Sequence, residues 1–232
     1  MLFNGTLIAE ASGRLGGVIF SHNAGGQYIR AGTIPTNPNT PFQQVVRTAV
    51  SSLTSSWRSI LAAAQRAAWD LYASNVPVTN RIGKQVNISG LAMFVRSNVA
   101  RVQAGEDAVI TAPGIFNLGV FTRANALNAT EAAQTIDIGF APTLPEDPWL
   151  SQTGSFLLAY VSRPQNPSVL FFKGPYRFAG SLQGDVVPPT APFVVNVPFA
   201  FVEGQRVFTK SVVTLADGRY TSSIRSSTVA VA

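Results

Sequence analysis

The spacing of apolar residues changes near Gly105, and this change constrains the fold more than any single motif does. Before it, apolar residues recur at steps of three and four, as on one face of a helix. After it, short β-branched and aromatic runs alternate with Gly, Pro, Asn and Asp, as in proteins built from short strands. The sequence therefore predicts an α+β protein with an N-terminal anchoring domain at residues 1–105, a linker at 106–114 and a β-domain at 115–232.

The first forty residues contain two strand patterns joined by a turn. Residues 18–22 and 27–30 suit strands, and the Asn-Ala-Gly-Gly segment between them tolerates positive φ. We therefore expect a β-hairpin, preceded by a glycine-rich turn at residues 12–17. Three prolines between residues 35 and 41 then favour an extended connection, which is either an arm laid over a neighbouring molecule or a stiff linker.

Three helices are predicted next, so that the N-terminal domain is a β-hairpin plus a three-helix unit. The first begins at Pro41, a residue that suits the first helical position. Its apolar stripe comprises Phe42, Val45, Val46, Ala49, Val50, Leu53 and Trp57. A second covers about residues 62–74, and the sequence leaves open whether it continues the first. After a short hairpin at 78–88, Ser89 caps a third helix that ends near residue 105.

The β-domain is expected to be an all-β sandwich of the immunoglobulin or fibronectin type III kind. Its strand-like runs cover residues 134–140, 155–162, 169–173, 193–201, 206–215 and 219–231. Their spacing fits seven antiparallel strands, and Ala216-Asp217-Gly218 suits a hairpin turn between the last two. The likeness is one of pattern, because the sequence has no Cys…Trp…Cys signature.

Few residues could carry chemistry. The chain has no cysteine and a single histidine, His22, which excludes disulfides, thiolate metal sites and polyhistidine metal sites. A Ser–His–Asp triad would need His22 as its base, but no G-x-S-x-G motif is present. Two pairs of adjacent carboxylates could serve acid–base chemistry, at residues 106–107 and at 146–147. The first pair lies in a linker and the second in a loop between strands, and both are typical of solvated turns. We therefore expect a protein that is not an enzyme and has no cofactor or metal.

The charged residues are sparse and unevenly placed. They make up 12% of the chain, against about 25% in a typical soluble domain. Residues 1–105 contain nine Lys or Arg against only Glu10 and Asp70. Nucleic-acid binding by this basic half is therefore an alternative to a structural role. Its phosphate contacts would weaken as the salt concentration rises. A further alternative is sugar binding by the β-domain, with an aromatic platform formed by Trp149, Tyr160 and Tyr176.

A membrane partner is not expected. No apolar run approaches the roughly 18 residues of a membrane-spanning helix. The first residues also lack the basic and apolar regions of a signal peptide. We therefore expect a protein that is assembled in the cytoplasm of the cell that makes it.

Spaced motifs within residues 10–100 resemble one protein family. These motifs are Ser12-Gly13-Arg14-Leu15-Gly16-Gly17, Gly25-Gly26-Gln27-Tyr28-Ile29-Arg30, Pro35-Thr36-Asn37-Pro38-Asn39-Thr40 and Gln65-Arg66-Ala67-Ala68-Trp69. In this order they resemble the opening of uncharacterised structural proteins encoded by tailed bacteriophages. The resemblance implies a virion component present in many copies, whose partners are other virion proteins and copies of itself, as in a homo-oligomer. We favour a capsid decoration or head-associated role, with a tail or head–tail connector role as the alternative.

The distinctive N-terminal part is also where we expect the assembly interface. The β-domain would then face outward. The residues expected at the interface are Arg14, Phe20, His22, Tyr28, Arg30, Pro35, Asn37, Pro38, Arg47, Arg58 and Arg66.

Overall fold

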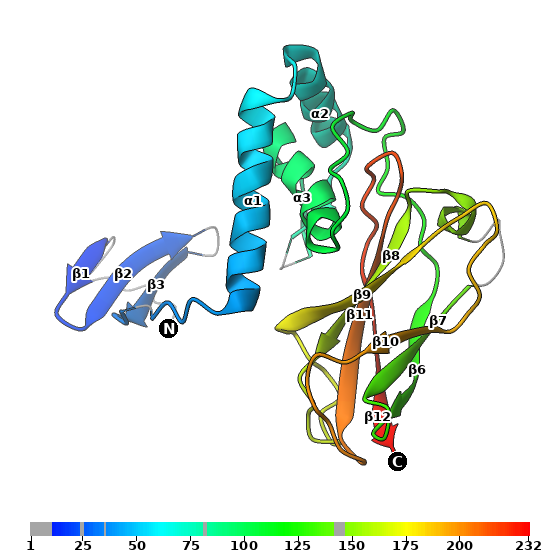
Figure 1. Cartoon of the computed structure of the whole chain (residues 1–232). Coiled ribbons are helices and arrows are strands. Elements are labelled where there is room, and N and C mark those ends of the chain that lie inside the picture. Colours follow the sequence, from blue (N-terminus) through cyan, green and yellow to red (C-terminus); the bar gives the residue numbers. More distant parts are fainter. Residues whose placement is uncertain (1–10, 24–25, 35, 81–82, 142–146) are drawn as a thin grey trace. The chain divides into compact units, whose positions relative to one another are not determined.

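The computed structural model describes residues 11–23, 26–34, 36–80, 83–141 and 147–232 (Figure 1). The chain divides into two compact units, Met1–Thr40 and Pro41–Ala232. The helices and the large sheet both belong to the second unit, so the linker predicted at residues 106–114 lies within it. Separate folding of the segments on either side of that linker stays a prediction.

The first unit contains a three-stranded antiparallel sheet in the order β1-β2-β3. Its strands are β1 (Gly13–Leu15), β2 (Val18–Asn23) and β3 (Gly26–Ala31). β2 pairs with β3 over the segments expected to form a hairpin. The turn expected over residues 12–17 is shorter than predicted, because residues 13–15 pair as a strand and Gly16, at φ 58°, begins the reversal of the chain. The predicted turn residues 24–25 lie outside the described residues.

The three expected helices are present. They are α1 (Pro41–Ser59), α2 (Ala63–Asn75) and α3 (Gly90–Gln103), with a short hairpin of β4 (Val78–Thr79) and β5 (Gln85–Val86) between the last two. α1 and α2 are separate helices, and Arg66 Nη1 donates a hydrogen bond to the Trp57 carbonyl in the last turn of α1 (3.3 Å). The Ser89 hydroxyl accepts from the Ala92 amide (3.3 Å), which confirms the predicted cap of α3.

An aromatic cluster holds the helices together. Trp69 is fully buried, and its ring packs edge to face against Tyr72 and Phe94, with centroids 5.9 and 5.5 Å away. Such pairs contribute about 0.5–1.5 kcal/mol beyond the burial of their area. The buried members of this cluster are Leu53, Leu61, Trp69, Tyr72, Ala73, Val76, Met93 and Phe94.

The strands that follow α3 form one seven-stranded sheet in the order β10-β7-β6-β12-β11-β8-β9 (Figure 1). The predicted strand number is confirmed, and β11 and β12 form the hairpin expected at the C-terminal end. The expectation of antiparallel pairing throughout is wrong at one place, because β12 and β6 run parallel, and the strands form one continuous sheet. The two outer strands approach each other, since a Cβ on Gly180 of β9 would lie 3.3 Å from Val195 Cγ1 of β10. The sheet therefore curves nearly into a barrel. Its strands are β6 (Ala124–Thr130), β7 (Thr135–Phe140), β8 (Phe156–Ser162), β9 (Tyr176–Gln183), β10 (Phe193–Asn196), β11 (Arg206–Thr214) and β12 (Ile224–Val231).

Two strands escaped the sequence prediction, and one predicted strand was wrong. β6 is rich in Ala and Asn, which are poor β-formers, but it is paired on both sides, by β7 and β12. β9 contains Gly180 where β10 approaches closely. The apolar run at 169–173 is not a strand, and Leu170 and Phe171 within it are exposed. Tertiary pairing decided each of these segments, and local propensity did not.

The sheet has a core on its inner face and a second contact layer on its outer face. Ile136, Ile138 and Val207 are among the fully buried inner residues. On the outer face, Phe156, Leu158 and Val212 pack against Ala100 of α3. The helices thus cover part of the sheet, and the two share buried apolar surface.

Side-chain hydrogen bonds fix the segment between α3 and the sheet. Asn98 of α3 bonds the backbone of Val109 twice, accepting from its amide at 2.7 Å and donating to its carbonyl at 3.2 Å. Trp69 Nε1 donates to the Ile110 carbonyl (3.0 Å). The segment predicted as a linker is therefore held against the helices. No helix among the described residues is long and apolar enough to cross a lipid bilayer.

Candidate assembly surface

Helix α1 keeps half of its apolar stripe exposed. Ala49 and Leu53 are buried, as the periodicity predicts, and Leu53 belongs to the apolar cluster of the helices. The part nearer the N-terminus differs, because four large apolar side chains there remain 38–52% exposed. They are Phe42, Val45, Val46 and Val50. A row of this kind on a helix is typical of a surface that another molecule covers.

The exposed part of α1 borders a groove. Phe42, Val45 and Val46 line one side of a cavity of about 270 Å³. The rest of its lining comes from α3, β8 and β9 and consists of Gln103, Tyr160, Tyr176, Arg177 and Phe178. The Arg177 guanidinium lies 4.8 Å from the centroid of the Phe42 ring, which is within the range of a cation–π contact. The groove is therefore largely apolar, with one cation beside it.

The three-stranded sheet of the first unit has two unlike faces. Arg14 and Arg30 both lie opposite Ile19 in the ladder, and residues directly opposite share a face. Leu15 and Val18 pair with each other on the other face, where Leu15 is 74% exposed. One face therefore carries arginines and the other carries exposed apolar side chains.

The remaining expected interface residues of this unit do not gather on one face. Tyr28 lies on the arginine face, since it pairs with Ser21, whereas Phe20 and His22 alternate with Ser21 and point to the opposite face. Beyond the sheet, Asn37 and Pro38 are exposed in an extended segment. Pro35 lies outside the described residues.

The three expected interface arginines on the helices have different surroundings. Arg47 and Arg58 are exposed on α1. Arg66 of α2 donates to the carbonyls of Trp57 and Arg58 at 3.3 and 3.5 Å. It therefore satisfies orphan carbonyls at the C-terminal end of α1, which accounts for an arginine there without a partner molecule.

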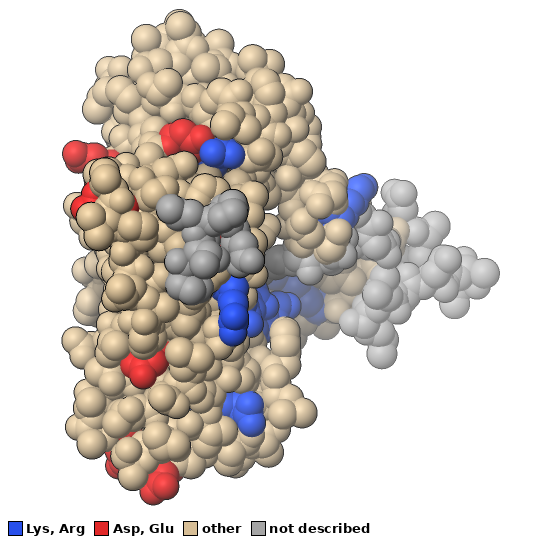
Figure 2. Space-filling view, turned by 90° about the vertical axis from the view of Figure 1, so that its right-hand side faces the viewer, with Lys and Arg blue, Asp and Glu red and all other residues tan. Residues whose placement is uncertain are grey.

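Charged groups are sparse on one face of the molecule. Figure 2 shows a face on which Lys, Arg, Asp and Glu are separated by broad uncharged areas. The sequence is consistent with this view, since charged residues make up only 12% of the chain.

A row of cations and aromatic rings crosses the outer face of the sheet. Arg225 of β12, Lys210 of β11, Tyr160 of β8 and Phe178 of β9 lie directly opposite one another in turn. Lys210 Nζ lies 5.6 Å from the centroid of the Tyr160 ring. Burial lowers the pKa of Lys210, and the charges of Arg225 and Arg96 lower it further. Burial raises the pKa of Tyr160.

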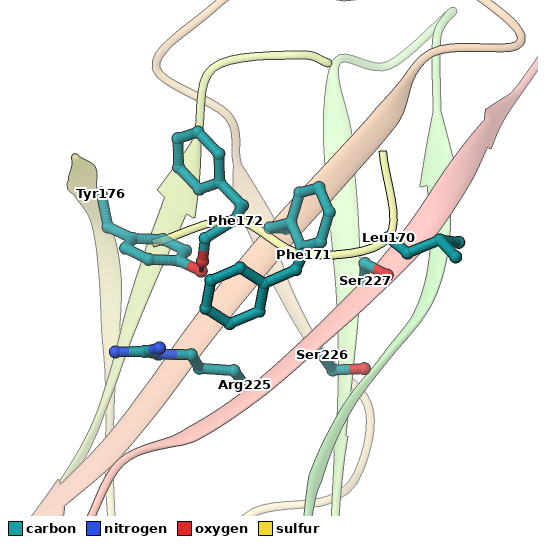
Figure 3. Close-up of a pocket in the computed structure, with 8 residues that line it drawn as sticks. Leu170, Phe171, Phe172, Tyr176, Arg225, Ser226 and Ser227 are labelled. Atoms are coloured by element: carbon teal, nitrogen blue, oxygen red, sulfur yellow. Dashed lines mark hydrogen bonds between the residues drawn. The ribbon is translucent and has the colours of Figure 1, made fainter. Parts of the chain in front are cut away.

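An aromatic pocket of about 220 Å³ lies next to this row (Figure 3). Phe172 packs against Tyr176 and Phe208, with centroids 5.3 and 5.6 Å apart, and Arg225 lies on the Tyr176 side. Tyr176, one of the three aromatics considered for sugar binding, lines this pocket. Trp149 cannot join it in a surface platform, because its side chain is fully buried.

In the described parts of the chain, no group of three or more His, Cys, Asp or Glu side chains is placed to hold a metal ion. His22 is exposed on β2 and lies opposite Gln27 in the ladder.

Comparison of the chain with protein-family models, with curated proteins and with solved structures gave no significant match. The resemblance to phage structural proteins therefore stays a prediction from the N-terminal motifs.

No pattern in the sequence predicted that Arg96, Lys210 and Arg225 lie near one another. Arg96 donates to the Tyr220 carbonyl (3.3 Å) across a separation of 124 residues, and Lys210 meets Arg225 only through strand pairing. The exposed half of α1 was also missed, because the apolar stripe shows no change along its length. Only tertiary structure distinguishes its buried from its exposed members.

Proposed function

We propose that this chain is a non-enzymatic structural component of a bacteriophage virion, with a capsid decoration or head-associated role. It assembles with other virion proteins and with copies of itself. The phage assignment is supported by the ordered N-terminal motifs. The structural role is supported by one observation above all, which is the exposed apolar half of α1.

The partner proposed for this α1 surface is a second copy of the chain. Each copy has a second apolar surface, on the face of its three-stranded sheet that bears Leu15 and Val18. A single sheet layer is marginally stable alone and gains from covering one face. A stable interface buries roughly 1,200–2,000 Å² in total, more than the four exposed α1 side chains supply. Burial of both apolar surfaces is therefore expected in the assembly.

Sedimentation of the full chain tests the self-association. We expect the wild type to shift towards larger species as concentration rises and a Val46→Asp variant to stay monomeric, because a carboxylate in the buried contact is costly. Leu71→Asp is the matched control, since Leu71 is an exposed apolar residue of α2 outside the groove. A monomeric wild type, or equal effects of the two variants, would contradict the proposal.

Mass spectrometry and immunogold labelling of purified phage particles test the virion assignment. The chain is expected in intact particles at a fixed copy number and at regular surface positions. Its position on a three-fold or six-fold lattice would indicate the head, and a stacked ring would indicate a tail or connector role. In the head assignment, the sheet-forming part serves as an immunoglobulin-like or fibronectin-like module that faces outward. Absence from particles would refute the virion role.

Nucleic-acid binding is a second candidate function, favoured by the acid-free stretch of residues 11–69. Arg47 and Arg58 are exposed on α1, and Arg14 and Arg30 share one face of the small sheet. Binding through these arginines would weaken steeply with salt, with a slope set by the number of phosphates contacted. A gel-shift titration between 50 and 200 mM salt tests it, and an absent or flat response would exclude it.

A further inference from the structure

Three cations meet on the outer face of the sheet without a carboxylate. Lys210 and Arg225 lie directly opposite each other on β11 and β12. Like charges in this position destabilise a sheet. Arg96 of α3 is close by, since it lines the same cavity as Arg225. No carboxylate of the described residues forms an ion pair with any of the three. Within the described parts of the chain, this concentration of positive charge is therefore not neutralised by an ion pair.

The two arginines of this group line one cavity. It has a volume of about 510 Å³ and lies among the β4 strand, α3, the segment before β6 and the start of β12. Three hydroxyl side chains complete its polar lining, and they belong to Thr79, Ser222 and Ser223. Leu118 is its apolar member. The lining therefore offers guanidinium and hydroxyl donors, and none of the described residues that form it is acidic.

The guanidinium of Arg96 is held in place. Its Nη1 donates to the Tyr220 carbonyl (3.3 Å), and its carbon lies 4.9 Å from the centroid of the Tyr220 ring. An arginine has five N–H donors, so this single bond leaves most of them available. Burial lowers the pKa of Arg96, a cost that an anion in the cavity would offset.

Arg225 stands between two cavities. It lines the basic cavity and also the aromatic pocket of Figure 3, where its guanidinium is on the side of Tyr176. The residue itself is exposed, and no hydrogen bond from its side chain to a described residue is found. Its donors can therefore turn to a ligand without breaking a contact of the fold.

We propose that this cavity binds a doubly charged oxyanion of the phosphate type, held by Arg96 and Arg225 and by the hydroxyls of Thr79, Ser222 and Ser223. Arginine matches the geometry of phosphate through paired N–H donors. Lys210 adds positive charge from the neighbouring strand and does not line the cavity. The cavity is far larger than one phosphate, which favours a phosphate group carried on a small organic molecule. The inference does not depend on the assembly role.

Thermal unfolding of the full chain with sodium phosphate tests the proposal. Sodium chloride at matched ionic strength is the reference, and sodium sulfate is a second dianionic probe. A ligand that binds only the folded state raises Tm by roughly 5–10 °C at a hundredfold excess over Kd in a chain of this size. We expect a saturable rise with phosphate and sulfate and none with chloride. An equal response to chloride would overturn the proposal.

Arg225→Gln is the decisive variant, because Arg225 is exposed and the fold should survive its loss. We expect at least tenfold weaker phosphate binding, whereas Arg123→Gln, at another exposed arginine, should bind as the wild type does. Equal phosphate responses in the two variants would overturn the proposal. If Arg225→Gln fails to fold by circular dichroism, ³¹P NMR line broadening with wild-type protein decides, and unbroadened phosphate refutes the site. Tighter binding of glycerol phosphate than of inorganic phosphate would identify an organic phosphate, and equal binding would identify the free anion.

Discussion

Replacement of Arg101 by methionine tests how firmly the helices and the sheet are joined. Arg101 lies near the end of α3 and is 6% exposed. Its Nη1 donates to the Gly154 carbonyl in the loop before β8 (2.9 Å), and its Nε donates to the Asp107 carbonyl (3.0 Å). Its guanidinium also lies 5.2 Å from the centroid of the Phe156 ring. One side chain thus connects α3, the following segment and the sheet.

The expected loss follows from these contacts. A hydrogen bond from a charged donor contributes about 1.5–3 kcal/mol, and the bond to Gly154 is of this kind. The bond to exposed Asp107 contributes less because water replaces it, and the ring contact adds about 0.5–1 kcal/mol. Burial lowers the pKa of Arg101, which means that keeping its charge in the folded state costs free energy. The methionine variant avoids this cost, so part of the lost stability is recovered. We expect a net destabilisation of about 2 kcal/mol, roughly thirtyfold in the folding equilibrium.

Urea unfolding followed by far-UV circular dichroism and by tryptophan fluorescence measures this effect. Trp57 and Trp69 report on the helices, and Trp149 reports on the part of the chain beside the sheet. If the helices and the sheet unfold together, the transitions seen by circular dichroism and by fluorescence coincide. Arg123→Met is the control and should change the free energy of unfolding by less than about 0.5 kcal/mol. A similarly small effect of Arg101→Met, or two separate transitions in the wild type, would refute a single joined structure.

Three further changes probe other parts of the second unit. Gly90→Ala should cost roughly 1–3 kcal/mol in urea unfolding, because its Cβ would lie 2.6 Å from the Asp70 amide nitrogen, whereas Gly114→Ala, with open space around it, should cost far less. Ile138→Ala should cost about 2–5 kcal/mol in the same assay, since Ile138 is fully buried inside the sheet, and a loss below 1 kcal/mol would contradict that placement. Burial raises the pKa of Tyr72 to about 12, so the folded state retains a proton that the unfolded chain loses near pH 10; stability should fall as pH rises from 10 to 12, and less steeply in Tyr72→Phe.

The helical half was predictable because its signals are local. Pro41 and Ser89 mark helix starts, and the stripe through Ala49 and Leu53 identifies the buried side of α1. In the sheet, five of the six predicted runs correspond to strands, which are β7, β8, β10, β11 and β12, whereas β6 and β9 were missed. β6 has the composition of a loop and becomes a strand because two neighbours satisfy its backbone groups, which no local pattern reveals.

The candidate sites depend on contacts distant in sequence, so they lay beyond sequence analysis. The expected interface arginines illustrate this limit. Arg14 and Arg30 come to share one face through strand register, whereas Arg66 serves as a cap within the helices. Residue type alone does not separate these uses. The cation group of Arg96 and Arg225 needs the pairing of helix and sheet to exist at all.

The two proposals rest on different surfaces, and a cross-test separates them. Val46 lines the apolar groove beside α1, and Arg225 lines the basic cavity beside α3. If both proposals hold, Val46→Asp abolishes self-association and keeps the phosphate response, while Arg225→Gln does the reverse. Loss of both properties in either variant would indicate that phosphate binding and assembly share one surface, because a point change in a folded protein acts mainly on its own contacts. Sedimentation with and without phosphate for the two variants therefore decides whether the anion regulates assembly or binds independently of it.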